Sequence, residues 1–151
     1  IFGTSGNSRL WKRIRERDGL SYDVRSVLSW SAIDDNTSWN LSAIFAPSNQ
    51  PKVEAAFNEE LARALKDGFT QEELNEARVG LLNFRRLARA QDASVASGLV
   101  NNLYLQRNFA FGQQVDDAIQ KLTLAQVNDA WRKYIKPQSL VMAWGGDFKA
   151  P

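Results

Sequence analysis

The chain has no histidine and no cysteine among its 151 residues. Without histidine there is no Ser-His-Asp or Cys-His nucleophile system and no imidazole general base. Ordinary zinc, copper and iron sites are excluded as well, because they need imidazole or thiolate ligands. Carboxylates, Lys, Arg, Tyr and backbone N–H groups remain for chemistry. We therefore expect this chain to hold no metal or other cofactor and to be inactive as an enzyme by itself.

Net charge is also small, with 19 Lys and Arg against 17 Asp and Glu. A formal charge of +2 is not that of a protein built to hold nucleic acid, so we expect no such partner. Uncharged stretches fall short of the ~20 apolar residues that a membrane-spanning helix needs. The absence of cysteine is compatible with a periplasmic and with a cytoplasmic location, so the location stays open.

The first helical pattern covers residues 8–19. Leu10 and Ile14 are one turn apart, Ser8 is a candidate N-cap, and Gly19 is a candidate stop. Most other residues in this segment are basic, which allows either a phosphate-binding surface or a solvated helix face. The interleaved carboxylates favour the solvated face.

A change to period two then indicates a long antiparallel hairpin. Its first strand is expected to place Tyr22, Val24, Ser26, Leu28, Trp30 and Ala32 on one face. After a turn at residues 34–37, the returning strand places Trp39, Leu41, Ala43 and Phe45 on one face. We expect Trp30, Trp39 and Trp131 to be core residues.

Four helices and a last strand are predicted after the hairpin. Two capping boxes, Thr70 with Glu73 and Thr123 with Gln126, start two of the helices. The last strand is predicted at residues 140–144. The apolar stripes of the four helices are Val53-Phe57-Leu61-Leu65, Leu74-Ala77-Leu81-Phe84-Leu87, Val95-Leu99-Leu103 and Val127-Trp131-Tyr134.

This order predicts an α+β fold, a two-layer sandwich in which helices pack on one face of a mostly antiparallel sheet. Residues 1–151 are expected to form a single domain. The sheet is short by at least one strand, so we expect a fragment of a longer chain that lacks the first strand or helix of the unit.

One run carries a resemblance to a known family. Residues 6–22, GNSRLWKRIRERDGLSY, resemble the signature of the second, non-zinc-binding domain of the pitrilysin/insulinase family of zinc peptidases. Residues 69–78, 122–137 and 146–148 agree with the family in order and spacing. The family includes mitochondrial processing peptidase and bacterial two-domain and two-subunit peptidases. The resemblance implies the repeated α+β unit of that family over nearly the whole chain.

The resemblance also implies a function. Catalysis in this family belongs to the motif H-x-x-E-H, which a chain without histidine cannot contain. The chain would be the C-terminal domain that completes a zinc site on an N-terminal zinc-binding domain or subunit. The family uses an Arg and a Tyr seven residues apart, which match Arg15 and Tyr22. Tyr22 would donate to the scissile carbonyl oxygen of a peptide substrate, and Arg15 would hold its backbone. Gly3, Ser5 and Gly6 match a further segment near the substrate chamber.

Other interpretations stay open at this point. By composition alone, Arg15 would pair with a carboxylate and Tyr22 would pack at the start of its strand. As a whole, the chain could be a non-catalytic assembly subunit, because the same family includes structural core subunits of membrane respiratory complexes. It could also be an unrelated α+β peptide-binding module.

Overall fold

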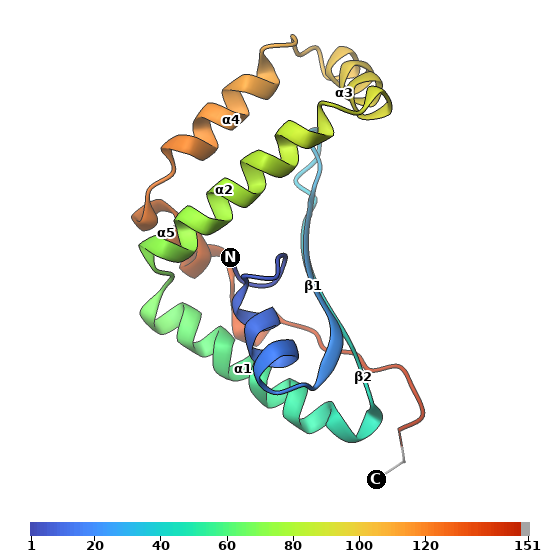
Figure 1. The fold of residues 1–151 in the computed structure, drawn as a ribbon, viewed down its shortest axis with the longest axis vertical. Helices are drawn as coiled ribbons and strands as arrows, with labels where there is room; N and C mark the ends of the chain where they lie inside the picture. Colours follow the sequence, from blue (N-terminus) through green and yellow to red (C-terminus); the bar gives the residue numbers. More distant parts are fainter. Residues whose placement is uncertain (149–151) are drawn as a thin grey trace.

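The computed structural model of the protein describes residues 1–148. Figure 1 shows a long hairpin along one side of the molecule, with the first helices at its base and three helices extending beyond them. In chain order the elements are the π-helix η1 (Trp11–Arg17), β1 (Ser21–Trp30), β2 (Thr37–Phe45), the 3-10 turn η2 (Pro47–Asn49), α1 (Gln50–Asp67), α2 (Gln71–Ala88), α3 (Asp92–Tyr104), α4 (Phe111–Lys121), α5 (Leu124–Tyr134) and the 3-10 turn η3 (Pro137–Ser139). The predicted α+β class is confirmed.

β1 and β2 pair antiparallel, and Trp30 is opposite Thr37 at the far end of the hairpin. In β2 the predicted face is confirmed, since every second residue from Trp39 to Phe45 packs against the core. In β1 a bulge lies between Ser21 and Asp23. A bulge inserts one residue and reverses the alternation of faces.

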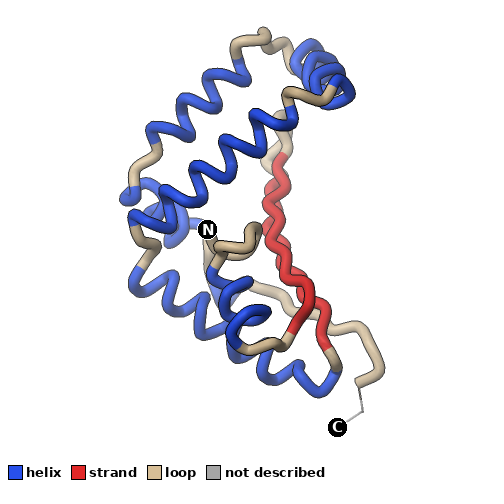
Figure 2. Tube along the Cα trace, in the orientation of Figure 1, coloured by secondary structure: helices blue, strands red, loops and turns tan. Residues whose placement is uncertain are grey.

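The bulge makes one sequence prediction wrong. Ser21 and Val24, three residues apart, are both buried, and Tyr22 is 80% exposed rather than sharing the inner face with Val24. Trp30 was expected in the core and is also exposed, because the hairpin extends past the helices that cover its base. Figure 2 shows the two strands, in red, continuing beyond the helices at their base.

The core lies where η1, α1 and α5 meet the inner face of the hairpin. Its buried apolar residues are Phe2, Leu10, Ile14, Val24, Val53, Ala56, Leu61, Ala64 and Phe69. Trp131 of α5 has its ring centre 4.9 Å from that of Phe2, 5.4 Å from Trp39 and 5.1 Å from Phe69, in tilted and edge-to-face arrangements. The prediction that Trp39 and Trp131 belong to the core is therefore confirmed.

Local helix signals are confirmed in most places. Both capping boxes form, with the side chains of Thr70 and Thr123 accepting from the N–H groups of Glu73 and Gln126. Gly68 ends α1 at φ 77°. The stripe predicted for α1 faces the core along its whole length. Ser8 differs from its prediction, because its hydroxyl donates to the carbonyl of Ser5 instead of capping the helix.

Two predictions after residue 70 are wrong, and one helix was not predicted. α4 was not predicted, although its half-buried residues Phe111, Val115 and Ile119 follow helical spacing. The second half of the α2 stripe, from Leu81 to Leu87, is exposed, because nothing among residues 1–148 covers it. Residues 140–144 form no strand there, since the sheet has only β1 and β2.

Candidate functional site

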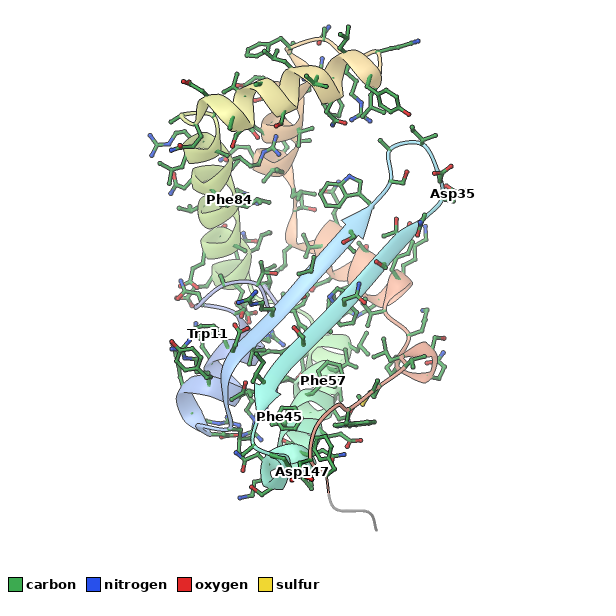
Figure 3. All side chains as sticks on the ribbon, turned by 90° about the vertical axis from the view of Figure 1, so that its right-hand side faces the viewer. Trp11, Asp35, Phe45, Phe57, Phe84 and Asp147 are labelled. Carbon is green, nitrogen blue, oxygen red and sulfur yellow. The ribbon has the colours of Figure 1, made fainter. Side chains whose placement is uncertain are left out.

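Arg15 and Tyr22, the pair singled out by the sequence, lie together in the structure. The guanidinium carbon of Arg15 is 4.7 Å from the ring centre of Tyr22. The same carbon is also 4.2 Å from the ring centre of Trp11. Figure 3 shows Trp11 on η1, beside the start of β1. Two aromatic rings thus hold one cation close to the surface, an arrangement worth about 0.5–2 kcal/mol per contact.

Three local features place these side chains. The π-helical turn puts Trp11 and Arg15 on one side of η1 and buries Leu10 and Ile14 on another. Single π-helical turns occur frequently at functional sites. Gly19 at φ 61° then reverses the chain, and the bulge at the start of β1 leaves Tyr22 facing solvent. The distance between Arg15 and Tyr22 is therefore set by backbone geometry that only the folded chain has.

The remaining arginines of this segment pair with carboxylates. Arg9 Nε and Nη2 contact the two oxygens of Glu73 at 2.5 and 2.8 Å. Arg13 binds Asp18 and also Glu59, at 2.7 Å, and Arg17 binds Asp18 at 3.1 Å. Because Arg9 and Arg13 are largely buried in these pairs, the prediction of a solvated basic helix face is only partly correct.

Arg15 differs from these three arginines. Within residues 1–148 its guanidinium makes no hydrogen bond and no ion pair with the protein. Stacking covers the faces of a guanidinium and leaves its in-plane N–H groups available. Arg15 therefore presents unused donors next to the exposed Tyr22 hydroxyl, which together can bind carbonyl oxygens or a carboxylate.

The glycine- and serine-containing segment 3–6 divides into two parts. Gly3 is buried, and a Cβ there would be 2.8 Å from Cβ of Ser26, so close packing on β1 explains this glycine. The Ser5 carbonyl accepts two hydrogen bonds from Ser8. Gly6 is exposed, and a Cβ there would be 3.9 Å from Trp11 Nε1. Gly6 thus adjoins the Arg15 stack, and Gly3 contacts β1 and Leu10 instead.

Sequence reasoning missed the contribution of Trp11 to this site. Trp11 was not among the site residues expected from the sequence, but it is half-exposed and stacks on Arg15. A signal was present, since an aromatic residue four positions before an arginine on a helix can reach it.

The later motifs serve packing. Asn128 in the segment 122–137 accepts the N–H of Phe69 at 2.7 Å and donates to its carbonyl at 3.3 Å. Arg78 donates to the carbonyls of Ile119 and Leu122 at 3.3 and 2.5 Å. The two motifs thus join the start of α2 to α4 and α5.

The carboxylate of Glu73 belongs to the same packing. Its burial acts to raise the pKa, but hydrogen bonds from Arg9 and from Thr70 outweigh that effect and hold the pKa below its ordinary value.

The donor set does not fit a zinc site within this chain. Zinc needs imidazole, thiolate or clustered carboxylate ligands, and in residues 1–148 no three such side chains converge. The same part of the chain contains no helix that is both long and apolar enough to span a bilayer.

Comparison with known proteins identifies the family. The family model described as the peptidase M16 inactive domain matches residues 1–81, more than half of the chain. The chain belongs to the peptidase M16 inactive-domain family. The resemblance read from residues 6–22 is thereby confirmed.

Individual proteins and solved structures are also similar to this chain. The chain is 28% identical over 143 residues to the non-peptidase homolog YmxG of Helicobacter pylori, covering 95% of this chain and 33% of that protein. The fold matches a peptidase M16 inactive domain from Pseudomonas fluorescens with a TM-score of 0.72 and 22% identity. This match covers 87% of this chain and 31% of the Pseudomonas chain.

The fold also matches the periplasmic protease PqqL of Escherichia coli, with a TM-score of 0.66 and 24% identity. This match covers 84% of this chain and 14% of PqqL. These likenesses show a shared fold. The chain spans about a third of the length of the curated relative it matches.

Proposed function

We propose that this M16 inactive domain completes the active site of a zinc metallopeptidase from the side opposite the metal. The zinc would be held by an N-terminal domain or a separate subunit, and the substrate would be a peptide. The observation that carries the proposal is the contact between Arg15 and Tyr22, with Tyr22 80% exposed.

The chemistry of the pair fits this role. The Tyr22 hydroxyl is a neutral donor that can bind the scissile carbonyl oxygen and strengthen its hydrogen bond as negative charge develops there. A preorganised donor of this kind is worth about 3–4 kcal/mol in comparable sites. Arg15, with its in-plane N–H groups unused by the protein, can hold substrate carbonyls in register. Gly6, Ser5 and Gly3 would line the approach of the substrate, with Gly6 nearest to the stack through Trp11.

The test is peptidase activity of the full-length protein together with any partner subunit. We expect Tyr22→Phe and Arg15→Ala to lower kcat/KM by about 10-fold or more with zinc content unchanged. Tyr134→Phe removes the hydroxyl of another exposed tyrosine, 71% exposed at the end of α5, and is the matched control, expected to leave activity unchanged. Activity of both site variants equal to wild type, in proteins that unfold normally, would contradict the proposal.

A second function, a non-catalytic subunit of the same family, is favoured by a separate observation. The relative from Helicobacter pylori is named a non-peptidase homolog. A full-length protein that contains no H-x-x-E-H motif and cleaves no peptide would support this function. In that case Arg15 and Tyr22 would bind a partner segment without cleaving it, and binding would weaken in the same variants.

A further inference from the structure

One carboxylate closes the turn of η1 on which Arg15 lies. The two oxygens of Asp18 accept from two different arginines, Oδ2 from Arg13 Nη1 and Oδ1 from Arg17 Nε at 3.1 Å. The side chains of Asp18 and Arg13 are only 22% and 16% exposed. Partly buried ion pairs are screened by salt much less than exposed ones. The pair of Asp18 with Arg13 therefore restrains the turn more firmly than a surface ion pair would.

The backbone joins the same two residues. The N–H of Asp18 donates to the carbonyl of Arg13 at 3.2 Å, and a bond to the fifth residue before the donor is that of a π-helical turn. In an α-helix the surface neighbours of residue 18 would be residues 14 and 15. The ion pair and the backbone bond have the same spacing along the chain. The ion pair thus stabilises the π turn against the α-helical alternative.

Arg13 also fixes this turn to the rest of the fold. Its Nη2 donates to Glu59 of α1 at 2.7 Å, and its Nε is 3.9 Å from Oε1 of the buried Glu60. Figure 1 shows η1 beside both α1 and the start of β1, and η1 contacts both elements. Asp18 therefore holds Arg13, and Arg13 holds α1, in a series of ion pairs that leaves out Arg15.

Tyr22 is held by different contacts. The hydroxyl of Ser21 is 2.7 Å from the carbonyl oxygen of Ile44 on β2 and 2.8 Å from that of Asp23. This hydroxyl therefore bridges the bulge that turns Tyr22 outward. The two halves of the site thus have separate supports, because Arg15 is placed by η1 and Tyr22 by the start of β1.

We propose that Asp18 is a positioning residue, which closes the π turn with Arg13 and thereby holds Arg15 between its two aromatic rings. The effect on activity rests on the proposed function, in which Arg15 holds substrate carbonyls. Asp18 acts through Arg15 and not on the substrate. Removal of its carboxylate should therefore displace the guanidinium of Arg15 and leave the support of Tyr22 in place.

Nuclear magnetic resonance of the full-length protein, labelled with 15N-arginine, tests the position of Arg15. Its Nε–H resonance is assigned in each background as the one that is absent after Arg15→Lys. The rings of Trp11 and Tyr22 shift this resonance away from that of a free arginine. We expect Asp18→Ala to move the resonance toward the free position. A resonance that does not move in Asp18→Ala would overturn the proposal.

Asp23→Ala is the matched control. The Asp23 side chain is 23% exposed, pairs with Arg25 at 2.8 Å and adjoins Tyr22 in the chain. The control therefore removes an ion pair of similar exposure from the same region without touching η1. We expect it to leave the Arg15 resonance and the activity unchanged. If Asp23→Ala moves the resonance as much as Asp18→Ala does, the specific role of Asp18 is refuted.

Peptidase activity of the full-length protein, with any partner subunit, shows whether Asp18 acts through Arg15. We expect Asp18→Ala to lower kcat/KM by about 10-fold, as Arg15→Ala does, because a misplaced binding group is a lost one. In an Arg15→Ala background, Asp18→Ala should cause no further loss, since no guanidinium is left to position. Losses that multiply in the double variant would give Asp18 a separate structural role and overturn the proposal.

The two measurements distinguish a failure of this role from a failure of the proposed function. If Arg15→Ala leaves activity unchanged, the proposed function fails, and the Arg15 resonance alone decides whether Asp18 positions the guanidinium. If Arg15→Ala lowers activity and Asp18→Ala does not, the proposed function stands and the role of Asp18 is refuted. Asp18→Asn, which removes the charge and keeps the shape of the side chain, replaces Asp18→Ala in both measurements if the alanine variant does not fold.

Discussion

Replacing Gly68 with alanine tests how the two later motifs hold the fold together. Gly68 ends α1 with φ 77° and ψ −169°, a backbone conformation that is nearly restricted to glycine. A Cβ added there would be 2.8 Å from Oδ1 of Asn128 and 2.9 Å from its Cγ and Nδ2. Asn128 cannot yield freely, because both of its side-chain polar atoms bond the backbone of Phe69.

The structure gives the magnitude of the effect. The backbone conformation costs an L-residue about 1–3 kcal/mol, and displacing Asn128 loses up to two hydrogen bonds worth about 0.5–1.5 kcal/mol each. We therefore expect Gly68→Ala to lower the free energy of unfolding by about 1–6 kcal/mol. For a chain of this size, each kcal/mol corresponds to about 2–4 °C in Tm.

The assay is urea and thermal unfolding of the protein, with two comparisons. Gly98→Ala is the matched control, since Gly98 lies inside α3 with open space around it, and alanine there should stabilise by about 0.5–1 kcal/mol. In an Asn128→Ala background the clash is absent, so Gly68→Ala should cost only the backbone part. If Gly68→Ala is tolerated as well as Gly98→Ala, the reasoning from Asn128 and from φ is refuted.

Three further predictions concern the ion pairs and the aromatic stack. Folding lowers the pKa of Glu73, so the contribution of this carboxylate to stability is present above its ordinary pKa of 4.5 and is lost as the pH falls through the folded value. In Glu73→Gln the free energy of unfolding should therefore depend less on pH in that range. Asp116→Asn should cost about 1–3 kcal/mol in urea unfolding, since the buried Asp116 holds Arg85 of α2 and Arg89 directly after it, and their hydrogen bonds lower its pKa. Trp11→Leu should weaken peptide binding as Arg15→Ala does, and Trp11→Phe should restore most of it, because an aromatic face is what Arg15 contacts. No rescue by phenylalanine would contradict that role.

Features confined to a few neighbouring residues were predictable. The capping boxes of Thr70 and Thr123 formed as expected, because their donors and acceptors are three residues apart in the chain. The stop at Gly68 and the reversal at Gly19 follow from the freedom of glycine at positive φ. The inner face of β2 followed from period two. For the candidate site, the family motif identified Arg15 and Tyr22, and the structure places them in contact.

The features that the sequence did not predict depend on which helices and strands contact one another in the fold. The bulge that turns Tyr22 outward is a property of the pairing between β1 and β2, which the alternation of one strand does not contain. The stripe of α2 is apolar from Leu74 to Leu87, about four turns, but only its first residues, near Leu74, meet a partner among residues 1–148. Residues 140–144 have a strand pattern without a paired neighbour.

By itself, then, the sequence determined the α+β class, the family and the helix ends at Gly68, Thr70 and Thr123, because residue pattern and short-range hydrogen bonding decide these. Only the tertiary structure decided that Arg15 is stacked between Trp11 and Tyr22 while its neighbouring arginines are paired, and that an apolar groove lies between β2, α1 and residues 140–145. The physical reason is that both arrangements bring separate segments together through backbone geometry and packing. A periodic pattern indicates which face of an element is apolar, but it does not indicate which other segment covers that face.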